Sequence, residues 1–210
     1  MVISGCVGPR GDGYLADRAM TVAAAADYHR PQIEAFREAD ADLVTAMTLN
    51  YAEEAIGIAR AAQSLAMPVV ISLTVETDGQ LPTGQPLSEA IAQIDAATHQ
   101  APAYYMINCA HPTHFAHALA QDADWLKRIR GIRANASRKS HAELNESETL
   151  DDGNPAELGH YYQALVRKLP HINVLGGCCG TDPRHIEAIY KACWPVAWAH
   201  LNPKNLIKAT

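Results

Sequence analysis

Cysteines are the residues of this chain best suited to chemistry, and their placement is informative. Cys109 follows one apolar run, and Cys178 and Cys179 follow another, between glycines. Thiols at the ends of two strands would offer zinc the sulfur ligands that it favours. Structural zinc takes four ligands, commonly from CxxC pairs, and this sequence has no CxxC. Three ligands leave a fourth position open, as in catalytic zinc sites. Three packed thiols are the alternative.

The chain holds five cysteines in all, and the count bears on how they are used. An odd number, with an adjacent pair that would close a strained ring, argues against a disulfide framework. Cys6 is expected at a strand end and Cys193 on a helix face. We expect both of these to be packing residues.

Polar side chains lie in or at the end of other predicted strands. Ser72 and Asn135 each fit either a substrate contact or a residue that only satisfies a turn. Asn108, directly before Cys109, is expected to orient the zinc ligands by hydrogen bonding.

Three further features have less specific interpretations. His111, His114 and His117 recur at steps of three, which drift around a helix by about 60° each time. We therefore expect a partly exposed helix start there rather than a metal site. The glycine-rich turn 8–13 lacks the spacing of a phosphate loop and is expected to shape a ligand site. The acidic stretch 143–152 is expected to be an extended, solvated loop, with a lid over the site as the alternative.

The elements that must position these residues alternate along the chain. Apolar and β-branched runs predict strands near 2–7, 41–49, 69–75, 104–109, 131–136 and 172–177. Alanine-rich amphipathic runs predict helices near 20–39, 52–66, 87–98, 112–120, 155–168 and 183–192. Six strand–helix units predict a parallel sheet, either an open doubly wound sheet or a barrel that is two units short of eight. In both architectures ligands bind at the carboxyl ends of the strands, where the cysteines fall.

Composition narrows the class of protein. Of 210 residues, 48% are hydrophobic and 19% are charged, which is typical of a globular chain, and we expect a single domain over 1–210. A formal net charge of −6 argues against nucleic acid as a partner. No apolar run approaches the roughly 18–20 residues of a membrane helix, and the start does not resemble a signal peptide. We expect a cytoplasmic protein that does not bind membranes.

Four segments together resemble a known family. They are GCVGPRGDGY (5–14), PVVISLTVE (68–76), MINCAHP (106–112) and GGCCGTDPRHI (176–186). The last two are similar to the zinc-binding segments of the homocysteine S-methyltransferase family, and all four occur in the family's order. The resemblance runs from residue 2 to about residue 193, which is nearly the whole chain.

The resemblance implies a TIM-type (β/α)8 barrel, of which this chain matches the third to eighth strands. It implies zinc held by Cys109, Cys178 and Cys179, with homocysteine as methyl acceptor and methionine as product. The donor would be S-methylmethionine, S-adenosylmethionine, a betaine or a methylated corrinoid. The absence of a folate or cobalamin domain favours a free small molecule. The expected substrate contacts are Asn108, Thr48, Ser72 and Asn135.

The sequence departs from the family pattern in two places. No Asp-Gly-Gly segment opens the chain, so the first two βα units of the family barrel have no counterpart. Met47-Thr48 stands where the family often has Glu-Thr, whose Glu helps to hold the amino acid. The alternative function is therefore a non-catalytic zinc-binding remnant, or a fragment of a longer methyltransferase. Unpaired edge strands would favour dimerisation or another form of homo-oligomer.

Overall fold

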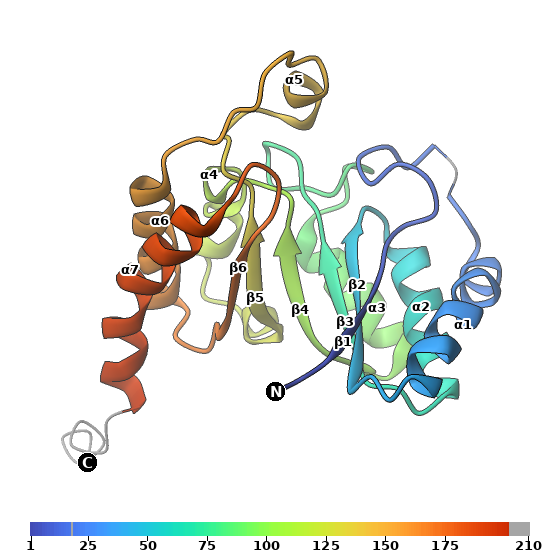
Figure 1. Cartoon of the computed structure of the whole chain (residues 1–210). Coiled ribbons are helices and arrows are strands. Elements are labelled where there is room, and N and C mark those ends of the chain that lie inside the picture. Colours follow the sequence, from blue (N-terminus) through green and yellow to red (C-terminus); the bar gives the residue numbers. More distant parts are fainter. Residues whose placement is uncertain (18, 202–210) are drawn as a thin grey trace.

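Six parallel strands form one curled sheet in the computed structural model, which describes residues 1–17 and 19–201 (Figure 1). Each strand pairs with its neighbours in chain order. The strands are β1 (Ser4–Val7), β2 (Leu43–Leu49), β3 (Val69–Leu73), β4 (Pro102–Asn108), β5 (Ile129–Ala134) and β6 (Val174–Gly177). This order, with every pair parallel, confirms the incomplete TIM-type barrel.

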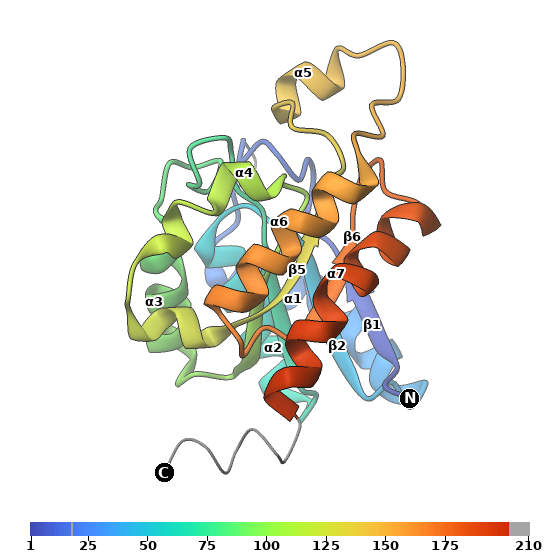
Figure 2. The ribbon, with the colours of Figure 1, turned by 90° about the vertical axis from the view of Figure 1, so that its left-hand side faces the viewer.

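Helices alternate with the strands and cover one face of the sheet (Figures 1 and 2). They are α1 (Val22–Glu38), α2 (Ala52–Ser64), α3 (Leu87–Thr98), α4 (Pro112–Phe115), α5 (His141–Asn145), α6 (Pro155–Lys168) and α7 (Pro183–Leu201). Two 3-10 turns, η1 (Ala118–Ala120) and η2 (Asp124–Arg128), precede β5. Unlike the others, α5 stands off beyond the carboxyl ends of the strands.

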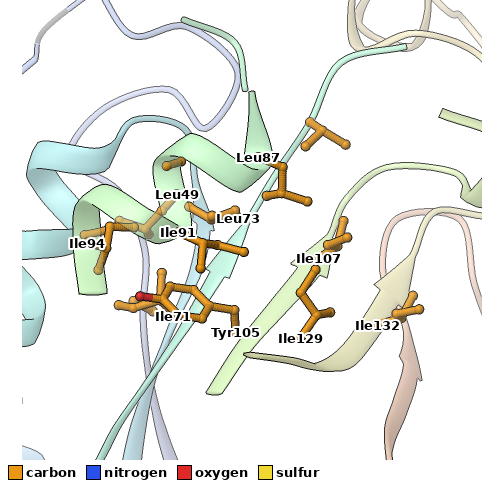
Figure 3. Packing of buried hydrophobic residues seen from close by; sticks show 14 of the residues in the cluster. Leu49, Ile71, Leu73, Leu87, Ile91, Ile94, Tyr105, Ile107, Ile129 and Ile132 are labelled. Atoms are coloured by element: carbon orange, nitrogen blue, oxygen red, sulfur yellow. The ribbon is translucent and has the colours of Figure 1, made fainter. Parts of the chain in front are cut away.

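The core lies between the sheet and these helices. Ile71, Leu73 and Tyr105 of the central strands meet Ile91 and Ile94 of α3, and all five side chains are fully or almost fully buried (Figure 3). β3 is buried at every position, since its sequence VVISL lies between two other strands and under the helices. The β-branched runs thus form the centre of the fold, and the polar residues are left at its ends.

Several expected elements differ from the structure in their extent. The expected helix 112–120 is broken into α4 and η1, and the last helix runs to Leu201 rather than stopping near residue 192. The acidic stretch is not wholly extended, because α5, which starts at His141, includes its first three residues. Ser140 accepts a hydrogen bond from the Glu143 amide, and Glu143 bonds back to the Ser140 amide, which together form a capping box.

Two edges of the sheet lack a paired strand among the residues that the structure describes. They are the outer sides of β1 and β6. The same part of the chain contains no helix that is long and apolar enough to cross a membrane.

Candidate metal centre

Three cysteines from two strand ends meet above the sheet. Cys109 follows β4, while Cys178 and Cys179 follow β6, and their three sulfurs all lie within 4.8 Å of one another. The sulfurs of Cys109 and Cys179 are 4.0 Å apart. Cys109 and Cys178, with Cα atoms 5.5 Å apart, are joined as a disulfide in this structure. The structure thus brings the three predicted cysteines together, and reduction of the Cys109–Cys178 bond leaves all three as thiols. Their role as metal ligands stays a prediction.

Sharp turns of the backbone make this clustering possible. Gly177 has no space for a Cβ, because the Thr181 side chain occupies that position. Thr181 in turn donates from its hydroxyl to the Cys178 carbonyl at 2.7 Å, closing the turn. Gly180 adopts a φ of +75°, which a residue with a side chain rarely does. Two consecutive cysteines can thus face the same partner.

Cys109 itself has a left-handed backbone, with φ of +55°. Such a conformation is uncommon outside glycine and persists where the surroundings enforce it. Its carbonyl accepts two hydrogen bonds, one from Asn135 Nδ2 at 3.0 Å and one from His141 Nε2 at 2.6 Å. These bonds hold the ligand loop in its strained form.

Asn135 connects the two loops that carry the cysteines. Besides donating to the Cys109 carbonyl, its Oδ1 accepts from the Cys179 amide at 3.1 Å. Only 2% of Asn135 is exposed, so both polar groups of the amide are used inside the protein. Asn135 thus fixes the distance between the two ligand loops.

A second buried network lies beside Cys109. Asn108 Oδ1 accepts from Ser72 Oγ at 2.5 Å and from the Thr48 amide at 3.0 Å, and Asn108 Nδ2 donates to Thr48 Oγ1 at 2.7 Å. Thr48 Oγ1 lies 3.9 Å from the Cys109 sulfur. Thr48 has a φ of +61°, at a register shift in β2, and is half-buried, whereas Asn108 and Ser72 are fully buried. The four expected substrate residues therefore surround the cluster, and their contact with substrate stays a prediction.

A pocket of about 720 Å³ opens next to the cysteines. It lies between the loop after β1, the ends of β3 and β5, and α5 with the acidic stretch that overlaps and follows it. Its lining carries four carboxylates and one histidine, with no Lys or Arg: Asp12, Glu76, Glu148, Asp151 and His141. Burial and the nearby Cys179 raise the pKa of Tyr14, which also lines it. The charged side chains of the pocket beside the cluster are thus acidic, and the acidic stretch forms one of its walls.

The HPTHFAH segment starts a helix, as predicted, with α4 beginning at Pro112 and His111 as its N-cap. His117 is exposed, whereas His111 and His114 are more deeply buried than a partly exposed helix start implies. Burial, with His114 and Arg138 nearby, lowers the pKa of His111 to about 4. His114 Nε2 donates to the Arg138 carbonyl at 2.8 Å and His117 Nε2 to the Asp78 carbonyl at 2.9 Å. These histidines tie loops together, and the metal-ligand cluster of the described residues contains none of them.

The two remaining cysteines differ from each other. Cys193 is buried in the core, as predicted for a packing residue. Cys6 is exposed, so its prediction as a packing residue is wrong. Its neighbour Gly5 faces the Phe36 ring of α1, so the alternation of β1 turns Cys6 to the opposite, uncovered face of the sheet.

Comparison with known proteins gives a consistent result. Homocysteine S-methyltransferase YbgG of Bacillus subtilis (strain 168) is 26% identical over 207 residues, covering 92% of this chain and 61% of that protein. The homocysteine methyltransferase MmuM from Escherichia coli has a similar fold in two crystal structures. Its oxidized form gives a TM-score of 0.67 at 23% identity, and its metallated form gives 0.65 at 22%. Both alignments cover 91% of this chain and 61% of MmuM.

The chain thus spans about 61% of the length of these relatives. A sequence model described as homocysteine S-methyltransferase matches residues 1–193. Because this match takes in both cysteine loops and all six strands, the chain belongs to the homocysteine S-methyltransferase family.

Proposed function

We propose that this chain transfers a methyl group from a small cationic donor, such as the sulfonium S-methylmethionine, to the thiol of homocysteine, giving methionine. We propose further that Cys109, Cys178 and Cys179 hold Zn²⁺ for this reaction. The observation that carries the proposal is the meeting of three sulfurs within 4.8 Å beside a pocket of about 720 Å³.

The donor set suits zinc. Thiolates are soft ligands that zinc accepts in tetrahedral sites, and three of them leave one position for a substrate. Similarity to a metallated methyltransferase supports the same interpretation. When bound, zinc keeps a coordinated thiol deprotonated at neutral pH, where a free thiol with a pKa near 8.5 is mostly protonated.

The protein binds and orients the two reactants of the proposed methyl transfer. The homocysteine sulfur attacks the methyl carbon of the donor, the new S–C bond forms, and the old one breaks with its electron pair left on the donor sulfur. A donor that starts as a cation ends neutral. The acidic lining of Asp12, Glu76, Glu148 and Asp151 attracts such a cation and would repel an anionic methyl carrier. Holding both reactants in line in a closed pocket supplies the remaining rate gain.

A second candidate is zinc binding with little or no methyl transfer. It is favoured by the two unpaired sheet edges and by the 61% coverage of the relatives. Met47 stands where the family often carries the Glu that holds the amino acid. Each lost hydrogen bond to a charged group of the substrate would cost about 1.5–3 kcal/mol.

Metal analysis of the reduced protein tests whether the three cysteines hold zinc. We expect one zinc per chain, lost in Cys178→Ser and retained in Cys193→Ser, whose thiol lies in the core. Full zinc content in Cys178→Ser would show that the site is wrongly placed.

Methionine formation tests the proposed methyl transfer. Homocysteine is incubated with S-methylmethionine or with a betaine, using this chain and a form lengthened by two further βα units. We expect S-methylmethionine to support turnover, with the longer form faster. Zinc binding without turnover by either form would leave only the second candidate. Preference for the betaine, which carries no net charge, over the cationic S-methylmethionine would refute the role of the acidic pocket.

A further inference from the structure

The segment 138–150, here called the lid loop, is a compact loop with its two ends held together. Just outside its ends, Ser137 Oγ donates to Asp151 Oδ2 at 2.7 Å. Gly153, which follows, lies against the Ala136 carbonyl with no room for a side chain. Loops closed at the base in this way behave as units that are packed by their own side chains. Figures 1 and 2 show α5, which belongs to this loop, beyond the carboxyl ends of the strands.

Most of the lid loop is exposed, and one side chain is the exception. Leu150 is 79% exposed and Glu143, Glu146 and Glu148 lie at the surface, whereas His141 is only 9% exposed. Ser147 and Lys139 make their side-chain bonds within the loop itself. Arg138, the first residue of the lid loop, bonds to Glu157 and Tyr161 of α6. Beyond Arg138, the lid loop is attached to the body of the protein mainly through His141.

His141 contacts three separate segments. Its Nε2 donates to the Cys109 carbonyl at 2.6 Å, and its Nδ1 lies 3.0 Å from Glu76 Oε1, just beyond β3. Its ring stacks on Tyr14 of the glycine-rich turn, with ring centres 3.8 Å apart and planes at 28°. Among the described residues, it is the lid-loop side chain that bonds to one of the three clustered cysteines.

We propose that His141 is a positioning residue that latches the lid loop over the pocket and, through the same bond, holds the backbone of Cys109. This inference rests on the proposed function, since it assigns the latch to the pocket in which methyl transfer would occur. A latch bonded to a ligand loop couples two events. Lid opening removes one of the two donors that hold the left-handed Cys109 backbone, and loosening of that backbone releases the lid.

Cleavage of the lid loop measures the latch directly. Reduced protein without added zinc is digested briefly with a glutamate-specific protease, and cuts after Glu143, Glu146 and Glu148 are counted by mass spectrometry. We expect His141→Ala to be cut about tenfold faster at these bonds than the wild type, because the open fraction of the loop rises. His171→Ala is the matched control, since His171 also donates from Nε2 to a backbone carbonyl, that of Leu126, outside the pocket.

Zinc release measures the coupling. Zinc-loaded protein is mixed with the chelator 4-(2-pyridylazo)resorcinol, and the rate of metal transfer is followed by absorbance. Residues that orient metal ligands change affinity about 10- to 100-fold. We expect release about tenfold faster in His141→Ala and unchanged in His171→Ala. His141→Gln keeps a donor for the Cys109 carbonyl and should restore most of the wild-type rate.

The outcomes separate this inference from the proposed function. Neither measurement requires methyl transfer. If the wild type forms no methionine, the proposed activity is refuted, while faster cleavage and zinc release in His141→Ala would still support the latch. Cleavage of His141→Ala at the wild-type rate overturns the latch, and unchanged zinc release overturns the coupling. If His141→Ala does not fold, Glu76→Ala removes the Nδ1 partner instead, and cleavage no faster than wild type would equally overturn the latch.

Discussion

Asn135 carries two hydrogen bonds that no other type of side chain reproduces in the same place. It donates to one ligand loop and accepts from the other. Asn135→Ala leaves the Cys109 carbonyl and the Cys179 amide without that partner, so we expect zinc affinity to fall about 10- to 100-fold. Competition with a chelator of known affinity measures this. Unchanged zinc affinity with a raised KM for homocysteine would show that Asn135 is a substrate contact instead.

Thiol reactivity distinguishes the two cysteines outside the cluster. Burial raises the pKa of the Cys193 thiol to about 11, so at pH 8 it is protonated as well as packed. Cys6 is exposed on the sheet. We expect iodoacetamide at pH 8 to label Cys6 and leave Cys193 unlabelled until the protein is unfolded, as read by peptide mass spectrometry. Labelling of Cys193 in the folded protein at the rate of Cys6 would contradict its placement.

Sequence patterns identified the clustered cysteines because their spacing and flanking glycines are distinctive. The partners that hold them were harder to predict. His141 and Cys109 are 32 residues apart, so their bond exists only after folding. A partly exposed helix start was predicted at His111 and His114. Both are buried, because His114 bonds to the distant Arg138 carbonyl and the His111 ring lies against Tyr161 of α6.

An ion pair fastens α3 to η2, and a tyrosine of β4 bonds to the same carboxylate. Arg128 donates twice to Asp95, at 2.8 and 2.9 Å, and the Tyr105 hydroxyl donates to the same carboxylate at 2.7 Å. Both charged side chains are mostly buried. Asp95→Ala leaves Arg128 unpaired in this position, so we expect a loss of about 3 kcal/mol in the free energy of unfolding, measured with urea.

The control for this pair is an exposed one. Asp124 lies 2.6 Å from Lys127, and both side chains are largely in solvent. Asp124→Ala should leave the urea midpoint unchanged, because exposed ion pairs contribute little. Equal changes in the free energy of unfolding for the two substitutions would mean that burial of the Asp95 pair does not affect stability.

Elements with a strong pattern were predicted well, and short ones were not. The β-branched run in β3 and the alanine-rich runs in α1 and α2 are long enough to show their period. α5 is five residues long and gives no period, although the Ser140-x-x-Glu143 capping box is a signal that would have found it. Helix α7 continues through Pro195 to Leu201, whereas the sequence pattern predicted that it ends at Ala192.

The strand count left barrel and open sheet unresolved, and the structure shows a barrel wall that stops at two edges. Beyond β1, Val2 and Ile3 are 69% and 54% exposed. Unpaired backbone flanked by apolar side chains favours association with another copy. We expect the sedimentation coefficient of the wild type to rise with protein concentration, and we expect a smaller rise for Ile3→Lys.

The matched control is Leu150→Lys, which adds the same charge on the exposed lid loop, outside the two edge strands. It should associate as the wild type does. If the wild type stays monomeric at every concentration, the edges are protected in some other way.

The cysteine cluster also closes a ring in the chain. Cys109 and Cys178 are 69 residues apart in sequence, so a bond between them, or a shared ion, encloses β5, the lid loop and α6. Closing a ring of this size removes conformational entropy from the unfolded chain, equivalent to about 4 kcal/mol of added stability. Among the residues that the structure describes, β6 pairs only with β5, so this strand depends most on the stability that the ring adds. The site that would bind substrate therefore also acts as a crosslink that stabilises the segment 109–178.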